Sequence, residues 1–239
     1  MNIGIYSGTF NPIHIGHVTV INYSIEELKL DLLYVVPNKY PVHKKRKYFL
    51  EPSLRIQMIQ YTLEESKYYH KVQISDFEIT SNQDSYSYIT VDYFRKKHPI
   101  DTLFFIIGID SLIFHFWHNF DSIWEKIDYF AVINRNIESE DLKIYMKQKL
   151  EDLKNKALEY NEILLKILDT YLDIDKKFIL LKIPRIEISS SLIWQRLEES
   201  KSIDYWVNEK VKKILYSIPL GGEKRNTNPP QKQNYEHTR

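Results

Sequence analysis

The sequence predicts an α/β fold built on a doubly wound parallel sheet, with a small helical part at the C-terminal end. Three observations support this prediction. Short apolar runs alternate with helical patterns as far as residue 183, which is the order of repeated strand–helix–strand units. The apolar runs are continuous, as in strands that helices cover on both faces. The chain has 239 residues, 43% of them hydrophobic, which is enough to bury one sizeable core.

Five compact runs rich in Ile, Val, Phe and Leu are expected to be buried strands. They are residues 2–6, 32–36, 103–107, 130–133 and 179–183. A sixth stretch, residues 71–79, alternates more between apolar and polar positions. We expect it to form an edge strand or a hairpin.

Helical patterns fill the intervals between these runs, at residues 17–29, 52–66, 87–97 and 111–126. Residues 140–171 repeat apolar side chains three and four positions apart, and as one unbroken helix they would be about 45 Å long. Asn155 and Asn161 are candidate breaks into a hairpin. This segment is expected either to pack on the sheet or to form a dimerisation arm.

Composition excludes several classes of protein. Lys and Arg number 33 against 32 Asp and Glu, a net charge of +1, so binding of nucleic acid through bulk charge is not expected. The absence of cysteine excludes a disulfide scaffold, a Cys-ligated zinc site and a thiol nucleophile. No apolar run approaches the ~18 residues of a membrane span, and the N-terminus lacks a basic signal-peptide region. We therefore expect a cytoplasmic protein with no membrane or nucleic-acid partner.

The domain organisation follows from the same survey. Residues 1–218 are predicted to form a single domain with a helical insertion near residues 137–177. Residues 219–239 contain Gly-Gly, Pro-Pro and a polar run with nothing to bury, so a disordered tail is expected.

The loop after the first predicted strand carries the strongest chemical signal. Gly8 allows a tight turn with close backbone approach, and Thr9 offers a hydroxyl and a backbone N–H. His14 and His17 stand at the start of the next helix, where anions bind well, and two imidazoles facing one phosphate can stabilise charge during group transfer. From the residues alone, a buried core pair or a chance cluster of histidines remains an alternative, whereas a zinc site would need a third ligand and none is evident. The full stretch reads Gly8-Thr9-Phe10-Asn11-Pro12-Ile13-His14-Ile15-Gly16-His17.

This stretch resembles the G-x-F-[DN]-P-x-H-x-G-H signature of the nucleotidyltransferase superfamily, and its last four residues also match the class I aminoacyl-tRNA synthetase signature. The resemblance implies a Rossmann-like fold of the HIGH type. It implies that His14, His17 and Thr9 are catalytic, with the two histidines holding α- and β-phosphate oxygens of ATP. It also implies that Gly8 and Phe10 belong to the ATP site.

A second signal follows the last predicted strand, where Ile188-Ser189-Ser190-Ser191-Leu192-Ile193 opens a helix. Three hydroxyls there serve as helix caps or hold a polyphosphate. The stretch resembles the I-S-S-T-x-I-R motif of adenylyltransferases, which places Ile188, Ser189, Ser190 and Ser191 in the ATP site. G-x-S-x-G is absent, so a nucleophilic serine is not expected.

The motif departs from the family at its last position. Trp194 stands where the family has arginine. Arg196 lies two residues further on, about 200° around a helix of 3.6 residues per turn, and cannot present its side chain on the same face. Either another cation holds the pyrophosphate or the activity is reduced.

Further matches concern the acceptor. Residues 36–44 resemble the V-P-x-x-x-P-x-H-K segment of nicotinate mononucleotide adenylyltransferases, which places Lys44 at a substrate phosphate. Arg55 resembles the arginine that follows this segment in the family, and a purely structural role is its alternative. Residues 85–90 resemble S-Y-T-x-x-T, which lies near the nicotinate carboxylate, and helix N–H groups there suit a carboxylate better than an amide. The resemblance assigns the acceptor to Asn11, Lys44, Tyr86, Ser87, Thr90, Trp117 and Arg135.

The stretch after the predicted strand 103–107 contains Gly108, Asp110 and Trp117, which resemble family residues on both sides of the site. Trp117 resembles a tryptophan that stacks on the pyridine ring, although core packing would explain it equally. Gly108 and Asp110 resemble the G-x-D motif on the adenosine side and complete the expected ATP site.

The resemblance spans about residues 2–216 and identifies the chain as a member of the bacterial nicotinate-nucleotide adenylyltransferases. It implies adenylyl transfer from ATP to nicotinate mononucleotide, giving deamido-NAD and pyrophosphate in NAD biosynthesis, with Mg²⁺ bound to ATP and no protein metal site. The alternatives are another acceptor (nicotinamide mononucleotide or phosphopantetheine), a class I synthetase fragment, and a non-catalytic nucleotide sensor. A monomer and a homo-oligomer remain equally open.

Overall fold

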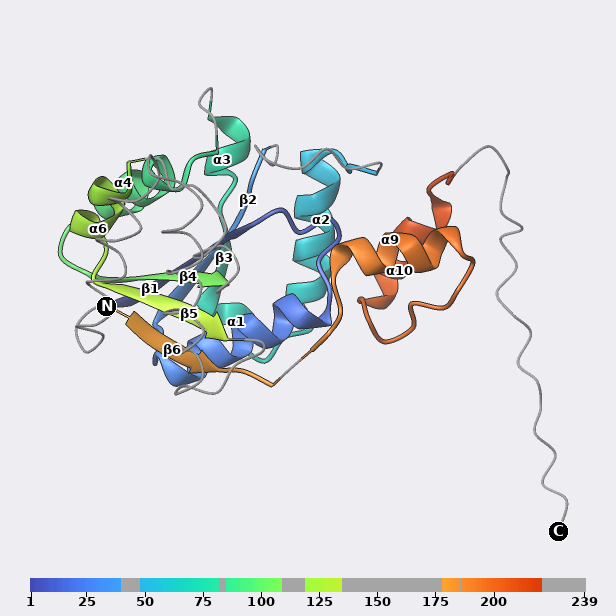
Figure 1. The fold of residues 1–239 in the computed structure, drawn as a ribbon, viewed down its shortest axis with the longest axis horizontal. Coiled ribbons are helices and arrows are strands. Elements are labelled where there is room, and N and C mark those ends of the chain that lie inside the picture. The colour runs from blue at the N-terminus through green and yellow to red at the C-terminus, as the bar shows by residue number, and fades with distance from the viewer. Residues whose placement is uncertain (40–47, 82–84, 109–118, 135–177, 185, 221–239) are drawn as a thin grey trace, which may run out of the picture.

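The computed structural model describes residues 1–39, 48–81, 85–108, 119–134, 178–184 and 186–220. Its centre is a six-stranded sheet in the order β3-β2-β1-β4-β5-β6 (Figure 1). Every neighbouring pair runs parallel. The direction of winding reverses between β1 and β4, which confirms the predicted doubly wound sheet. The strands are β1 Asn2–Gly8, β2 Leu32–Pro37, β3 Val72–Ile74, β4 Thr102–Gly108, β5 Tyr129–Asn134 and β6 Phe178–Lys182.

The five expected buried strands form within two residues of their predicted ends. The sixth stretch is only partly as expected. β3 is an edge strand paired with β2, but a hairpin is wrong, because residues Phe77–Thr80 form the short helix α3. The ring of Phe77 stacks on Tyr93 with 3.9 Å between centroids, so its apolar side chain is partly covered by a neighbouring helix and not by a second strand.

The helices are α1 Ile15–Glu27, α2 Pro52–Leu63, the 3-10 turn η1 Tyr69–Lys71, α4 Ser87–Lys97, α6 Phe120–Lys126, α9 Ser190–Glu198 and α10 Glu209–Ser217. α4 has the predicted bounds. The expected helix over residues 111–126 is wrong as a continuous element, because Asn119 has a left-handed φ of 53°, which an α-helix of L-residues does not continue through. Residues 111–118, the 140–171 pattern, the insertion near 137–177 and residues 221–239 of the expected tail lie outside the described residues.

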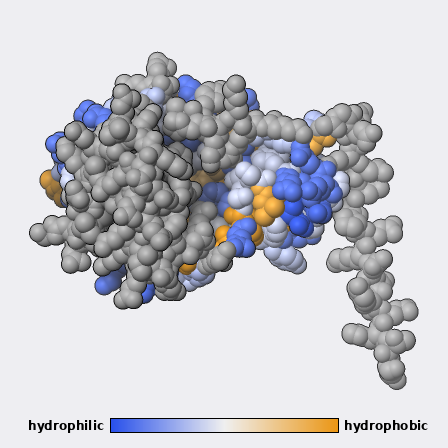
Figure 2. Space-filling view, viewed as in Figure 1, coloured by the Kyte–Doolittle hydropathy of each residue, from blue (hydrophilic) through white to orange (hydrophobic). Residues whose placement is uncertain are grey.

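The two faces of the sheet are covered by different helices. One hydrophobic cluster joins β1, β2 and β4 to α1, α2, α9 and α10. The other joins the opposite face to α4 and α6. α9 and α10 form the C-terminal helical part at one end of the molecule (Figure 1), where α10 contacts α2. On the face in Figure 2, the described residues of this part are mainly hydrophilic, with a few hydrophobic side chains among them.

Candidate active site

The candidate site lies at the carboxyl ends of the central strands. Gly8 at the end of β1 pairs with Pro37 at the end of β2, and Gly108 ends β4, the neighbour of β1 on its other side. This is the point where the strand order reverses, which is where ligands bind in open α/β sheets. The loop after β1 carries Thr9, Phe10, Asn11 and His14 of the residues predicted from the sequence.

His14 and His17 begin helix α1 by capping it reciprocally. His14 is the N-cap residue, and its Nδ1 accepts a hydrogen bond of 3.1 Å from the N–H of Gly16. The Nδ1 of His17 accepts one of 3.2 Å from the N–H of His14. The two rings lie 3.8 Å apart between centroids. Since each Nδ1 accepts a hydrogen bond, each neutral ring carries its proton on Nε2. The helix start therefore sets both tautomers.

Gly16 leaves room for this geometry. A Cβ atom at position 16 would lie 3.0 Å from both Nδ1 and Cε1 of His14, closer than ordinary van der Waals contact. A side chain there would therefore crowd the His14 ring, which would have to shift slightly. The glycine of the motif thus serves the histidine that precedes it.

Phe10 supports His17 from inside the protein. Its backbone has a φ of 46°, and its ring is 1% exposed. The ring meets Tyr6 edge-on at 5.4 Å and lies 5.0 Å from the His17 ring between centroids. The side chain of Phe10 is therefore placed under the histidine, and an ATP contact at this position would come from its backbone.

Asn11 and Ser190 hold the first loop in place. The Asn11 side chain is fully buried, donates to the carbonyl of Tyr48 at 2.9 Å and accepts from the N–H of Leu50 at 3.0 Å. Ser190 Oγ donates to the carbonyl of Pro12 at 2.9 Å. The Asn11 amide and the Ser190 hydroxyl thus hold the loop in place. The Asn11 amide has a second hydrogen and a second lone pair and the Ser190 hydroxyl can still accept, so these bonds are compatible with the acceptor and ATP roles expected for the two residues.

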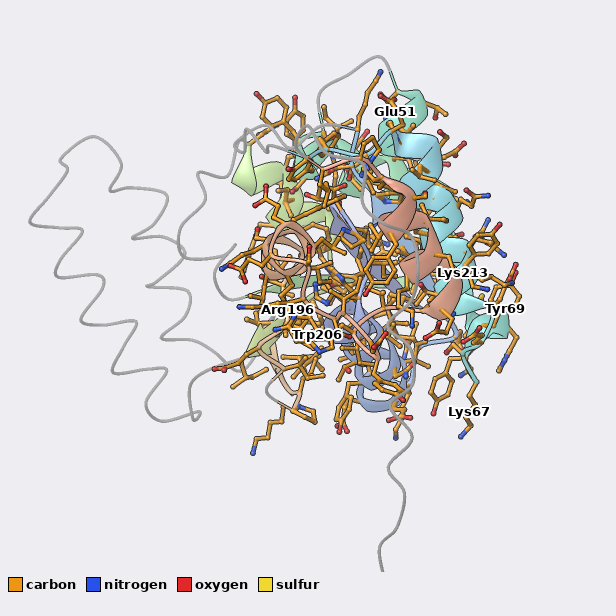
Figure 3. The ribbon with its side chains drawn as sticks, turned by 90° about the vertical axis from the view of Figure 1, so that its right-hand side faces the viewer. Glu51, Lys67, Tyr69, Arg196, Trp206 and Lys213 are labelled. Atoms are coloured by element: carbon orange, nitrogen blue, oxygen red, sulfur yellow. The ribbon has the colours of Figure 1, made fainter. Side chains whose placement is uncertain are left out.

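Trp194 continues this attachment of α9 to the loop. Its indole Nε1 donates to the carbonyl of Asn11 at 2.9 Å, and its ring stacks on Tyr48 at 5.0 Å. With 6% exposure, it faces the protein interior. Arg196 turns the other way, as the helical spacing predicts: it donates to the carbonyl of Ser202 at 2.7 Å, and its guanidinium lies 4.7 Å from the ring centre of Trp206 (Figure 3). Arg196 does not take the position of the missing arginine.

The remaining residues of the second motif lie at the start of α9. Ser189 is the N-cap, and its side chain accepts a hydrogen bond from the N–H of Leu192 at 3.2 Å, which confirms the expected cap. Ser191 is exposed and Ile188 is partly buried. Ser189 is exposed as well, so two of the three serines lie at the surface and Ser190 is buried.

Arg55 ties the loops after β1 and β2 together. Its side chain is fully buried and donates to the carbonyls of Thr9 and Asn38, each at 2.7 Å. Further bonds reach the carbonyl of Lys39 at 3.0 Å and that of Leu50 at 3.2 Å. A buried charge is tolerated when its donors are satisfied in this way. Thr9 is held a second time, because its hydroxyl accepts from Asn38 Nδ2 at 3.3 Å.

The expected acceptor residues of the third motif lie at the start of α4. Tyr86 is the N-cap residue, and no side chain caps this helix. Ser87 is partly buried. Thr90 is 1% exposed, and its hydroxyl donates to Glu78 Oε1 at 2.8 Å. The hydroxyl of Thr90 therefore points to a carboxylate inside the protein.

Glu78 is a residue that the sequence analysis missed. It is 4% exposed, and its Oε1 also accepts a hydrogen bond of 2.8 Å from Ser7 Oγ. Burial raises the pKa of the Glu78 carboxyl above its ordinary value, opposed by hydrogen bonds from Ser7, Thr90 and Ser85 and by the charge of Arg55. In the sequence, Glu78 is a single acidic residue between Phe77 and Ile79. An exposed acid on a surface helix gives the same pattern, so the sequence does not reveal that Glu78 is buried.

Four predicted site residues, Lys44, Asp110, Trp117 and Arg135, lie outside the described residues. Within the described ranges, no three His, Asp or Glu side chains gather as metal ligands would. In the same ranges, no helix combines the length and the apolar character needed to cross a membrane.

The sequence matches the cytidylyltransferase-like family model over residues 5–196. It is 31% identical over 217 residues to a Clostridium tetani protein named "Probable nicotinate-nucleotide adenylyltransferase", covering 90% of this chain and 96% of that relative. A Pseudothermotoga lettingae protein of the same name is 35% identical over 213 residues, covering 88% and 93%. The fold resembles Plasmodium falciparum nicotinic acid mononucleotide adenylyltransferase complexed with NaAD, with a TM-score of 0.64, 22% identity and coverage of 91% and 96%.

Proposed function

The chain belongs to the nicotinate-nucleotide adenylyltransferases of the cytidylyltransferase-like family, and on this basis we propose that it transfers the adenylyl group of ATP to nicotinate mononucleotide. The products are deamido-NAD and pyrophosphate. One observation carries the proposal on the structural side: in the reciprocal cap of His14 and His17 each Nδ1 accepts a backbone hydrogen bond, which leaves Nε2 as the protonated atom of both neutral rings at one helix start, beside the switch point of the sheet.

In the proposed reaction, a 5′-phosphate oxygen of the acceptor attacks the α-phosphorus of ATP. A new P–O bond forms as the bond between the α-phosphorus and the bridging oxygen breaks, and the electron pair leaves with pyrophosphate. A phosphate monoester is largely ionised near neutral pH, so no strong base is needed. Catalysis then consists of positioning and charge stabilisation.

His14 and His17 serve this chemistry as hydrogen-bond donors. Their Nε2–H groups stabilise the negative charge that develops on the α- and β-phosphate oxygens. Thr9 assists from the preceding turn, where Arg55 holds its carbonyl at 2.7 Å. Because the cap fixes both rings before ATP binds, little reorganisation is needed during the reaction.

The remaining ATP contacts in this proposal come from the ends of β1 and β4 and the start of α9. They involve Gly8, the backbone of Phe10, Gly108, Asp110, Ile188, Ser189, Ser190 and Ser191. Mg²⁺ binds mainly through phosphate oxygens and water with one or two carboxylates, and the described residues offer no cluster of three ligands. Mg²⁺ therefore fits as an ion that arrives with ATP, where it neutralises phosphate charge.

The acceptor is proposed to lie at the start of α4. This helix begins without a side-chain cap, so its first N–H groups suit an anion such as the nicotinate carboxylate. Tyr86 and Ser87 stand at that position. The motifs also keep Asn11, Lys44, Thr90, Trp117 and Arg135 in the proposal. An uncharged amide gains less from a helix N-terminus, which favours the acid over nicotinamide mononucleotide.

Pyrophosphate release tests the proposal directly. The protein is incubated with ATP and Mg²⁺, and with nicotinate or nicotinamide mononucleotide in parallel. We expect release with the acid at a kcat/KM at least ~10-fold above that with the amide, the scale of one to two kcal/mol. Equal rates would remove the carboxylate argument and keep the enzyme class. No release with either acceptor, despite ATP binding, would contradict the proposal and favour a nucleotide sensor.

A further inference from the structure

We infer that Glu78 is a positioning residue for acceptor binding, since its buried carboxylate joins the end of β1 to the first turn of α4. The inference rests on the proposed function, because it concerns the half of the site assigned to the acceptor. Ser7 stands directly before Gly8, and Thr90 is the fourth residue of α4. Both hydroxyls meet the same carboxylate oxygen at 2.8 Å.

The bonds span parts of the chain that no backbone ladder connects. Ser7 and Glu78 are 71 positions apart, and Glu78 and Thr90 are 12 apart. β1 and α4 are separate elements, and Ser81, Ser85 and Tyr86, which precede α4, belong to no helix or strand. The carboxylate of Glu78 is the group through which the start of α4 is bonded to the central strand.

Charge explains why an ionisable side chain is held at such a buried position. A carboxylate that is 4% exposed is costly unless it is hydrogen-bonded and faces an opposite charge. Its two hydroxyl donors meet the first condition, and the charge of Arg55 meets the second. Arg55 in turn holds the carbonyls of Thr9 and Asn38. The two ionic groups therefore link the acceptor side to the loop that precedes His14.

Two hydrogen bonds from Lys39 also hold the residues before α4. The N–H of Lys39, just after β2, donates to Ser85 Oγ at 3.2 Å, and Lys39 Nζ donates to the carbonyl of Ser81 at 3.3 Å. The residues before α4 are thus held from β2 as well as through Glu78. Because α4 lacks a side-chain cap, the direction of its first N–H groups depends on these contacts. A shift of that helix start would move the acceptor and leave the ATP contacts of α1 and α9 in place.

The test compares Glu78→Gln with a matched control, Glu26→Gln. Glu26 also accepts a hydrogen bond from a hydroxyl, that of Tyr68, but it lies on α1 away from the switch point. Wild-type enzyme is assayed first. We expect E78Q to raise the KM for nicotinate mononucleotide at least 5-fold, to change the KM for ATP less than 2-fold, and to keep its melting temperature within a few degrees. E26Q should leave both KM values unchanged.

Two variants on the partner side keep the test decisive if E78Q folds poorly. Thr90→Val and Ser7→Ala each remove one hydroxyl that donates to Glu78, and each should raise the acceptor KM as E78Q does. Unchanged acceptor KM in both E78Q and T90V, or an equal rise in both KM values, would overturn the inference. A wild-type protein that releases no pyrophosphate would instead overturn the proposed function, and the inference with it.

Discussion

The indole of Trp194 donates a 2.9 Å hydrogen bond to the carbonyl of Asn11, a residue 183 positions earlier in the chain. This bond attaches helix α9 to the loop that precedes His14. It also explains how the chain accommodates tryptophan where the resemblance led us to expect arginine. The side chain at this position stabilises the loop from inside, and a phosphate contact is not its role in this structure.

The substitution Trp194→Phe is expected to destabilise the protein by about 1–3 kcal/mol, the cost of leaving a buried carbonyl without its donor. Chemical denaturation measures this free energy of unfolding. Trp206→Phe is the control, because the Trp206 ring is only partly buried and would lose little beyond its contact with Arg196. Equal losses in the two variants would show that ring size, and not the hydrogen bond, accounts for the effect.

The substitution His17→Ala is expected to lower kcat for pyrophosphate release at least ~100-fold, the scale of losing one electrostatic donor. His70→Ala is the control, since His70 is exposed in η1. Steady-state kinetics with both substrates saturating gives the answer. A kcat for H17A within 3-fold of wild type would contradict the role given to this ring.

The substitution Arg55→Lys is expected to cost about 3–5 kcal/mol of stability, because a lysine cannot reach the carbonyls that the buried guanidinium holds and would leave Glu78 poorly paired. Arg95→Lys is matched to it: Arg95 also donates to several carbonyls, including those of Lys126 and Asp101, but at the opposite end of the sheet and with partial exposure. Urea unfolding should show the larger loss for R55K. A smaller loss of stability in R55K than in R95K would contradict the stabilising role given to the buried Arg55 guanidinium.

Glu78 is also expected to give the protein a pH-dependent stability. Burial raises its pKa above the ordinary value of 4.5, so in the window above that value the folded state binds more protons than the unfolded state. The contribution is then fully present below the ordinary pKa and is lost as the pH rises through the raised one. Urea midpoints of wild type and E78Q, compared across this window, should diverge in favour of E78Q with rising pH. Parallel curves would contradict this assignment.

Local patterns predicted the fold because each main element has a local cause. Continuous apolar runs gave the five buried strands, and α4 began and ended at its predicted residues, 87 and 97. Two elements differ from the prediction. The 71–79 stretch ends in the helix α3, where Phe77 stacks on Tyr93 of α4. The left-handed backbone at Asn119 interrupts the apolar pattern over residues 111–126 that predicts one helix.

The site was predicted less completely, for a similar reason. The motifs placed His14, His17 and Ser189 at helix starts, where the structure has them. Burial of charge, however, is a property of the folded chain. Glu78 looks in the sequence like any solvated acid, and the inward direction of Asn11 and Trp194 depends on contacts with residues far away in the chain.

The histidine cap at the start of α1 has an evolutionary consequence. Asparagine, aspartate and serine are good N-caps, so any of them at position 14 would preserve the beginning of the helix while removing the imidazole. On the role proposed for His14, a lineage that acquired such a change would keep its fold and lose its turnover. Activity and structure would then be separable at this residue by a single substitution, whereas at Gly16 a Cβ would crowd the ring of His14 itself.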